Sequence, residues 1–301
     1  MKVCGFTFIR NAEKFDFPVV EAITSVLPLC DRFVVAVGDS EDKTRQIIKK
    51  IPSPKITVID TVWDSSLRKG GMVYAAETDK AFRAIPQEYD WCFYIQGDEV
   101  MHEQFLPAVR QAMKENLERE DVEGLLFRFR HFFGTYDYVG DSRKWYRREI
   151  RIIRNDKSIY SYRDAQGFRK QGRKLRVVPV DAEIYHYGWV RSPKFMQAKI
   201  NSVRQFYEGI SEEQAHKQVE EQVFHYGDNY DALVRFQGTH PAVMQERIGR
   251  LNWNARVKPG TKRMNLRYRL LYYFEKMTGI RPFEYRNYRL LKRRRRLSLL
   301  S

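Results

Sequence analysis

The stretch WCFYIQGDEV, residues 91–100, decides how the rest of the chain is interpreted. Its apolar, aromatic run stops at a glycine and is followed by two adjacent carboxylates, Asp98 and Glu99. Open α/β sheets place their ligands at the carboxyl ends of such buried strands. Two neighbouring carboxylates repel each other and destabilise the folded chain unless positive charge neutralises them. A divalent cation, which prefers oxygen ligands, is the simplest source of that charge. Taken alone, the stretch also fits a strand that runs into an acidic turn and a helix cap.

The residues before position 135 alternate between strand-like and helix-like patterns. Strand patterns cover 3–9, 33–37, 56–62 and 91–95, and helical patterns follow Asp16, a good N-cap, then Ser40, then Gly70. This alternation predicts βαβ units in an α/β fold with a Rossmann-type, mostly parallel sheet flanked by helices. Three loops, at 10–11, 38–40 and 96–99, then share the carboxyl edge of the sheet, where a ligand crevice is expected.

The pattern changes from about residue 123. Residues 124–133, GLLFRFRHFF, alternate aromatic with basic side chains, as a half-exposed strand does. Residues 149–154 and 176–187 also have strand patterns, and Ser192-Pro193 begins a helix. We expect one domain over 1–210, in two parts, 1–122 and 123–210. A helical, basic extension over 211–301 follows, with five consecutive cations at 292–296.

Composition narrows the class of protein. With 43% hydrophobic residues the chain is not largely disordered, and its formal charge of +16 predicts polyanionic partners such as nucleotide phosphates, anionic lipid or nucleic acid. Three cysteines in apolar surroundings indicate reduced core residues of a cytoplasmic protein. Neither a secretory signal nor an apolar run of about 20 residues is present, so a soluble or peripheral protein is expected.

In their order, these motifs resemble family 2 glycosyltransferases of the GT-A fold, of a bacterial surface-glycan type. The family's acidic metal motif, commonly Asp-x-Asp followed by an acid, corresponds to residues 96–99, although Gln96 replaces the first acid. FTFIRNAEKF is similar to the turn after the family's first strand, and VAVGDSEDKT has Asp39 where an aspartate contacts the base and ribose. YHYGWVRSPKFMQAK resembles a His-Tyr-Gly segment followed by a Pro-initiated helix. The resemblance covers about residues 3–200. It implies a catalytic domain over 1–210, with a nucleotide-binding half at 1–122 and an acceptor half at 123–210.

The resemblance implies roles for individual residues. Asp98, Glu99 and His186 would hold a divalent metal, Mn²⁺ or Mg²⁺, although an ordinary strand-end histidine is the alternative for His186. Arg10, Asn11 and Asp39 would bind the nucleotide.

An inverting transferase also needs a general base near the acceptor hydroxyl. The resemblance favours Asp164 for this role, and Asp141 and Glu149 compete with it. Lys69 opens a Lys-Gly-Gly sequence before a helix and is a phosphate-binding candidate, with a solvated loop lysine as the alternative.

The leading hypothesis is sugar transfer from a nucleotide-sugar donor to a hydroxyl of a glycan or lipid-linked acceptor. A nucleotidyltransferase on a related sheet is the runner-up, since it also uses carboxylates and a metal. A nucleic-acid-binding protein is a third class, because aromatic residues on the basic strand 124–133 could stack bases. No nucleic-acid motif is found, so no nucleic-acid partner is expected.

The basic tail favours a further partner. Leu270, Leu271, Tyr272, Phe274 and Met277, with flanking Arg and Lys, predict a helix that lies on an anionic membrane surface. Together with the resemblance, which implies lipid-linked acceptors, this predicts a location at the inner face of the cell membrane. Nucleic-acid binding and a solvated end are the alternatives for the tail.

Overall fold

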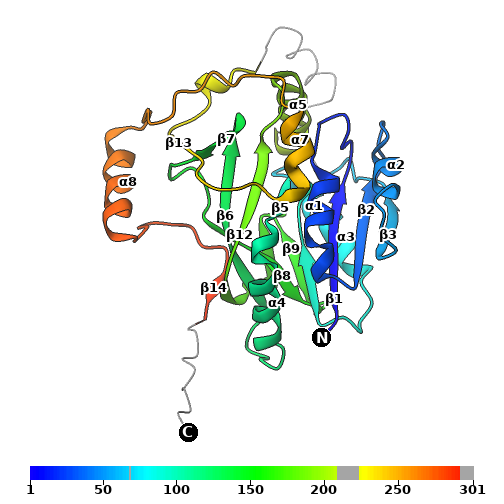
Figure 1. Ribbon diagram of the computed structural model, residues 1–301. Helices are drawn as coiled ribbons and strands as arrows, with labels where there is room; N and C mark the ends of the chain where they lie inside the picture. The colour runs from blue at the N-terminus through cyan, green and yellow to red at the C-terminus, as the bar shows by residue number, and fades with distance from the viewer. Residues whose placement is uncertain (68, 209–223, 292–301) are drawn as a thin grey trace.

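The computed structural model describes residues 1–67, 69–208 and 224–291. Its centre is a curved, eleven-stranded sheet whose main path runs β13-β7-β6-β8-β4-β1-β2-β3 (Figure 1). Helices cover both faces, so the predicted α/β class is confirmed.

The first half of the sheet is parallel, as predicted. Strands β1 (Val3–Ile9), β2 (Arg32–Gly38), β3 (Ile56–Thr61) and β4 (Trp91–Tyr94) pair in parallel, and helices α1 (Val19–Val26), α2 (Thr44–Lys49) and α3 (Met72–Arg83) connect them. A 3-10 turn over Leu27–Leu29 extends α1. All four strands therefore end at one edge of the sheet, where the three predicted loops meet.

The predicted N-cap at Asp16 is wrong. Pro18 occupies the N-cap position of α1, where no side-chain cap forms. Asp16 instead adopts a positive φ of 51°, and its carboxylate accepts a hydrogen bond of 2.6 Å from Arg247.

The second half of the sheet mixes strand directions. It contains β5 (Glu99–Met101), β6 (Gly124–Phe133), β7 (Thr135–Gly140), β8 (Arg148–Arg154) and β12 (Arg176–Trp189), which confirms the three strands predicted after residue 123. Strand β8 is antiparallel to both β4 and β6, whereas β12 pairs in parallel with β6 and antiparallel with β5. Strands β9 (Ile159–Tyr162), β10 (Gly167–Lys170) and β11 (Arg173–Lys174) form a separate small sheet.

Strand β6 is more buried than its alternating pattern predicts. Phe127, Phe132 and Phe133 are all buried, because other parts of the chain pack over both faces of the sheet at this strand. Arg130 donates to Glu183 of β12 at 2.7 and 2.9 Å, so this cation is neutralised across the sheet. The strand therefore presents no row of exposed aromatic rings on which bases could stack.

Two apolar layers hold the helices on the sheet. One face packs against α1, α2 and α4 (Leu106–Glu115), and the other packs against α3 and the small sheet. The predicted state of Cys4, Cys30 and Cys92 is confirmed, since all three are buried and free.

Helix α5 (Pro193–Glu208) follows β12 and confirms the predicted helix start at Ser192-Pro193. Further on, β13 (Leu233–Arg235) pairs with β7, and β14 (Arg289–Leu290) pairs with β12. Helices α7 (Gln245–Gly249) and α8 (Leu266–Thr278) lie between them, and short 3-10 turns cover Glu103–Phe105, Tyr226–Asp228 and Ala242–Met244.

The division into domains at residue 210 remains a proposal, and the basic run at 292–296 lies outside the described residues. Within the described ranges, no helix combines the length and the apolar character that crossing a bilayer requires.

Candidate active site

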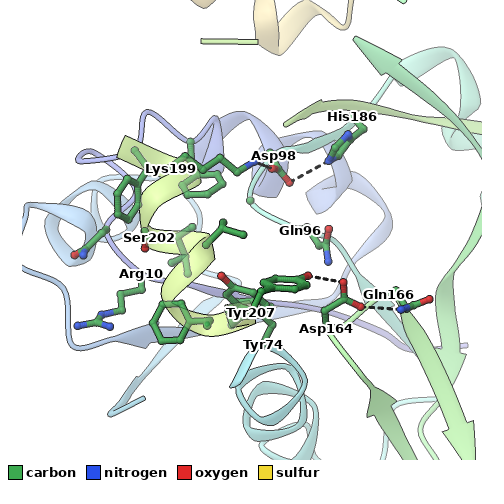
Figure 2. A pocket seen from close by; sticks show the side chains of 18 of the residues that line it. Arg10, Tyr74, Gln96, Asp98, Asp164, Gln166, His186, Lys199, Ser202 and Tyr207 are labelled. Carbon is green, nitrogen blue, oxygen red and sulfur yellow. Dashed lines mark hydrogen bonds and ion pairs between the residues drawn. The ribbon is translucent and has the colours of Figure 1, made fainter. Parts of the chain in front are cut away.

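A cavity of about 290 Å³ lies at the carboxyl ends of β1 and β4 and is bordered by α5 (Figure 2). Its floor comes from the ends of the strands, and one face of α5 forms a wall. Because Lys199, Ser202, Val203, Phe206 and Tyr207 follow the i, i+3, i+4, i+7, i+8 spacing of a helix face, they all line it together. This is the position where open α/β sheets bind ligands.

Asp98 lies at one end of the cavity, between two basic side chains. Its Oδ2 accepts a hydrogen bond of 3.0 Å from Lys199 Nζ, and its Oδ1 is 3.7 Å from His186 Nε2 (Figure 2). Burial alone would raise the pKa of Asp98, but the charges of Lys199 and Arg191 outweigh it and hold that pKa well below its usual range. Asp98 is therefore an anion at neutral pH.

Hydrogen bonding fixes the tautomer of His186. The Nε2–H of His131 donates to the Tyr146 carbonyl oxygen at 2.8 Å, and burial lowers the pKa of His131 well below its usual value, so its Nδ1 is an acceptor. His186 Nδ1 lies 3.1 Å from that atom and must donate. Since burial also lowers the pKa of His186, its Nε2 carries a lone pair beside Asp98.

This arrangement is typical of a metal-ligating histidine, whose other nitrogen donates to a neighbour. Asp98 and His186 would therefore suit a divalent cation as two of its ligands.

The contacts of Glu99 argue against its predicted role as a metal ligand. Glu99 is fully buried, and its two oxygens accept hydrogen bonds of 2.6 and 2.7 Å from Arg151. The backbone N–H of Gln96 donates a third hydrogen bond to Glu99, at 3.1 Å. Among the described residues, no group of three or more His, Cys, Asp or Glu side chains is placed to hold a metal, which leaves two protein ligands at most from the predicted set.

The predicted nucleotide-binding loops meet at the edge of the cavity. Arg10 lines the cavity, and its Nε donates to the backbone oxygen of Asp39 at 3.1 Å. The guanidinium also lies 5.4 Å from the centre of the Trp63 ring. The exposed Asp39 side chain is beside the cavity rather than in its lining, and Asn11 lines it but uses its side-chain oxygen to hold the Glu41 amide.

The position of Lys69 favours the alternative of a solvated loop lysine over a phosphate site. Lys69 is exposed and does not line the cavity. The amides of Gly70 and Gly71, which would face a phosphate, donate instead to the carbonyl oxygens of Tyr207 and Phe206 at 3.4 and 3.0 Å. The carboxyl end of α5 therefore covers the start of α3 and uses its donors.

Asp164 lines the cavity from the loop between β9 and β10. Its carboxylate accepts hydrogen bonds from Tyr207 Oη and, at 2.9 Å, from Gln166 Nε2 (Figure 2). The alternative base Asp141 lies outside the cavity and is held by Tyr272 at 2.5 Å. Asp164 and Glu149 are therefore the two candidates that remain.

Glu149 differs from Asp164 in its environment. Its carboxyl group is buried, Oε2 has no hydrogen-bond partner, and burial raises its pKa to about 8. A carboxyl that is protonated at neutral pH cannot accept a proton, so Asp164 is the better candidate for a general base.

Glu149→Gln is expected to be more stable than wild type at neutral pH, and the difference between the two proteins should grow as the pH rises. In wild type, the unfolded chain ionises this group from about pH 4.5 and the folded chain only at about pH 8, so stability is lost between these values. The maximal difference is about 5 kcal/mol, at about 1.4 kcal/mol for each pH unit. Thermal unfolding of both proteins from pH 5 to pH 8 measures it. A melting-temperature difference that does not change with pH would contradict the assignment.

The chain was compared with protein families, curated proteins and solved structures. No protein-family model matches the chain, and no curated protein matches it either. Among solved structures, S. aureus TarS 1–349 in complex with UDP is 15% identical with a TM-score of 0.39, over 73% of this chain and 70% of that one.

Glucosyl-3-phosphoglycerate synthase from Mycobacterium tuberculosis, solved with Mn²⁺, UDP and glucosyl-3-phosphoglycerate, is 17% identical with a TM-score of 0.30, over 44% of each chain. Because these scores are low, they carry no argument for the function of this protein.

Several residues of the cavity were not predicted from the sequence. They include Trp63, Tyr74, Lys199 and Tyr207. The signal for two of them was present in the sequence, because Lys199 and Tyr207 share one face of the helix that follows the predicted His186. Trp63 lies between β3 and α3, in a stretch with no regular pattern. Tyr74 lies in the first turn of α3, and the helical pattern there does not show that this side chain reaches the cavity.

Proposed function

We propose that this protein is a glycosyltransferase of the GT-A fold, similar to family 2. It would transfer a sugar from a nucleoside-diphosphate-sugar donor to a hydroxyl group of a glycan or lipid-linked acceptor. The observation that carries the proposal is a single cavity with the Asp98–His186–Lys199 cluster at one end and the carboxylate of Asp164 on the same lining. The buried, free cysteines favour a cytoplasmic location.

The donor's diphosphate would lie against Lys199. The ammonium group has three N–H donors, of which one bonds Asp98 and another bonds the Gly188 carbonyl oxygen at 2.9 Å. The third is available to an oxygen in the cavity that Lys199 lines. Arg10, Asp39 and the Trp63 ring would hold the nucleoside at the neighbouring edge.

Asp98 and His186 would hold a divalent cation, Mn²⁺ or Mg²⁺. When bound, it neutralises the negative charge that develops on the diphosphate leaving group. The contribution of the protein is the pair of free electron-donating atoms, Asp98 Oδ1 and His186 Nε2, held side by side.

Asp164 would act as the general base. The acceptor oxygen forms a bond to the anomeric carbon as the bond to the diphosphate oxygen breaks, and the hydroxyl proton passes to Asp164. The Tyr207 hydroxyl orients the carboxylate through its hydrogen bond. This attack inverts the anomeric configuration, so a product of retained configuration would contradict both the inversion and the role of Asp164.

Nucleoside diphosphates are expected to stabilise the folded protein, since a ligand of the folded state raises the melting temperature. The test titrates UDP, GDP, ADP and CDP and their nucleosides, each in EDTA and in Mn²⁺. Lys199→Met is expected to weaken binding of the diphosphate about tenfold or more and to leave nucleoside binding unchanged, because it removes a charged hydrogen bond.

Lys194→Met is the matched control, since Lys194 is exposed on the same helix and lies outside the cavity. A protein that no nucleoside diphosphate stabilises would contradict the proposal. Release of pyrophosphate from a nucleoside triphosphate would indicate a nucleotidyltransferase instead.

A further inference from the structure

Helix α8 presents an apolar stripe to solvent. Leu266, Leu270, Tyr273, Phe274 and Met277 follow one face of the helix, and their exposed fractions are between 41% and 79%. The stripe continues past the end of the helix to Ile280, 61% exposed, and Phe283, 88% exposed. Contiguous apolar surface of this kind marks a site of interaction with a partner or a membrane. We call these seven residues the α8 stripe.

The opposite face of α8 is fastened to the protein by polar contacts. Tyr272, the one buried residue of the helix, donates its hydroxyl to Asp141 at 2.5 Å, and Lys276 Nζ donates to the same carboxylate at 2.6 Å. Glu275 accepts from Arg143 at 2.8 Å and lies 3.2 Å from Arg147. A helix of a globular protein usually buries its apolar face. Here the polar contacts turn that face inward and leave the α8 stripe exposed. Helix α8 itself lies at the periphery of the molecule (Figure 1).

The positive charge around the α8 stripe favours an anionic partner. Residues 262–291 contain eight Lys and Arg but two acids, Glu275 and Glu284. Both acids are paired with arginines, Glu275 with Arg143 and Glu284 with Arg147, the latter at 3.0 and 3.1 Å. A second copy of the chain would bring like charges together at this surface. An anionic lipid bilayer offers an apolar layer for the stripe and negative headgroups for the cations.

We propose that α8 and the loop to Phe283 dock on the surface of an anionic bilayer, with the α8 stripe in the interfacial layer. Arg267 and Arg269, both exposed on α8, contact the headgroups. The sequence predicted Tyr272 as part of this apolar face, whereas the structure turns Tyr272 toward the protein and adds Leu266, Tyr273, Ile280 and Phe283 to the face. This inference does not depend on the proposed sugar transfer.

Sedimentation of the full-length protein with vesicles tests the proposal. Vesicles of equimolar phosphatidylcholine and phosphatidylglycerol are expected to bind wild type, and vesicles of phosphatidylcholine alone are expected to bind it at least tenfold more weakly. The double variant Leu270→Gln, Met277→Gln is expected to bind the anionic vesicles about tenfold more weakly, because it removes two interfacial side chains. Its melting temperature should be unchanged, since both side chains are exposed.

Val62→Gln is the matched control, because Val62 is 72% exposed at the end of β3, outside α8. The cations at 292–296 are intact in both variants, so a contribution from them cancels in the comparison. Equal binding of the double variant and wild type would overturn the proposal. The proposal would also be overturned if wild type did not bind the anionic vesicles. Self-association of wild type that the double variant abolishes, with no binding to lipid, would overturn it as well.

Discussion

Replacing Asp164 with Asn is expected to lower kcat about 10³-fold, the range in which the loss of a general base falls. Asparagine keeps the shape of the side chain and can still accept a hydrogen bond from Tyr207, but it cannot take a proton from the acceptor. The KM for the donor should change little, because the donor is expected against Lys199 and Arg10. Steady-state release of the nucleoside diphosphate, measured with the donor that the titrations identify, gives both constants.

Asp181→Asn is the matched control, since this carboxylate is 79% exposed and pairs with Arg128 at the surface. Asp164→Asn with wild-type kcat would assign the base elsewhere. A variant that loses donor binding and retains kcat would make Asp164 a donor ligand rather than a base.

Replacing Glu99 with Ala is expected to cost about 3–5 kcal/mol of unfolding free energy, the largest loss of stability that we predict. The substitution leaves the guanidinium of Arg151 charged in a site where its side chain is 1% exposed. Urea unfolding followed by circular dichroism measures the loss. The double variant Glu99→Met, Arg151→Met should recover much of it, because it removes both charges together.

A loss below about 1 kcal/mol for Glu99→Ala would contradict the prediction, because the ion pair of Glu99 and Arg151 would then be no stronger than an exposed one. The same variant also tests whether Glu99 binds a metal ion. If Glu99 does not bind the metal, the molecules that remain folded should show the same dependence of nucleotide binding on Mn²⁺ as wild type.

The meeting of the three predicted loops could be derived from the sequence. Parallel strands joined by helices all end at one edge, so Arg10, Asp39 and Asp98 had to come close once the βαβ pattern was recognised. Glu99 was harder to assign. Its carboxylate pairs with Arg151 of β8, 52 positions further along the chain, and no local pattern reveals that contact.

Other parts of the site depend on packing that no local pattern encodes. The amides that follow Lys69 were expected to be free at the start of α3, but the docking of α5 uses them, and helix docking depends on contacts far apart in sequence. The same docking brings Lys199 to Asp98. The raised pKa of Glu149 likewise follows from burial, which cannot be calculated for one residue from its neighbours in the chain.

The pairing of β4 with β8 has a consequence for the synthesis of the protein. When the first four strands have left the ribosome, the edge of β4 is still unpaired, because β8 lies more than 50 residues further along the chain. An open strand edge is a template for association with other chains. The nascent polypeptide therefore passes through an interval of exposure that ends only when Arg148–Arg154 emerges and closes the edge.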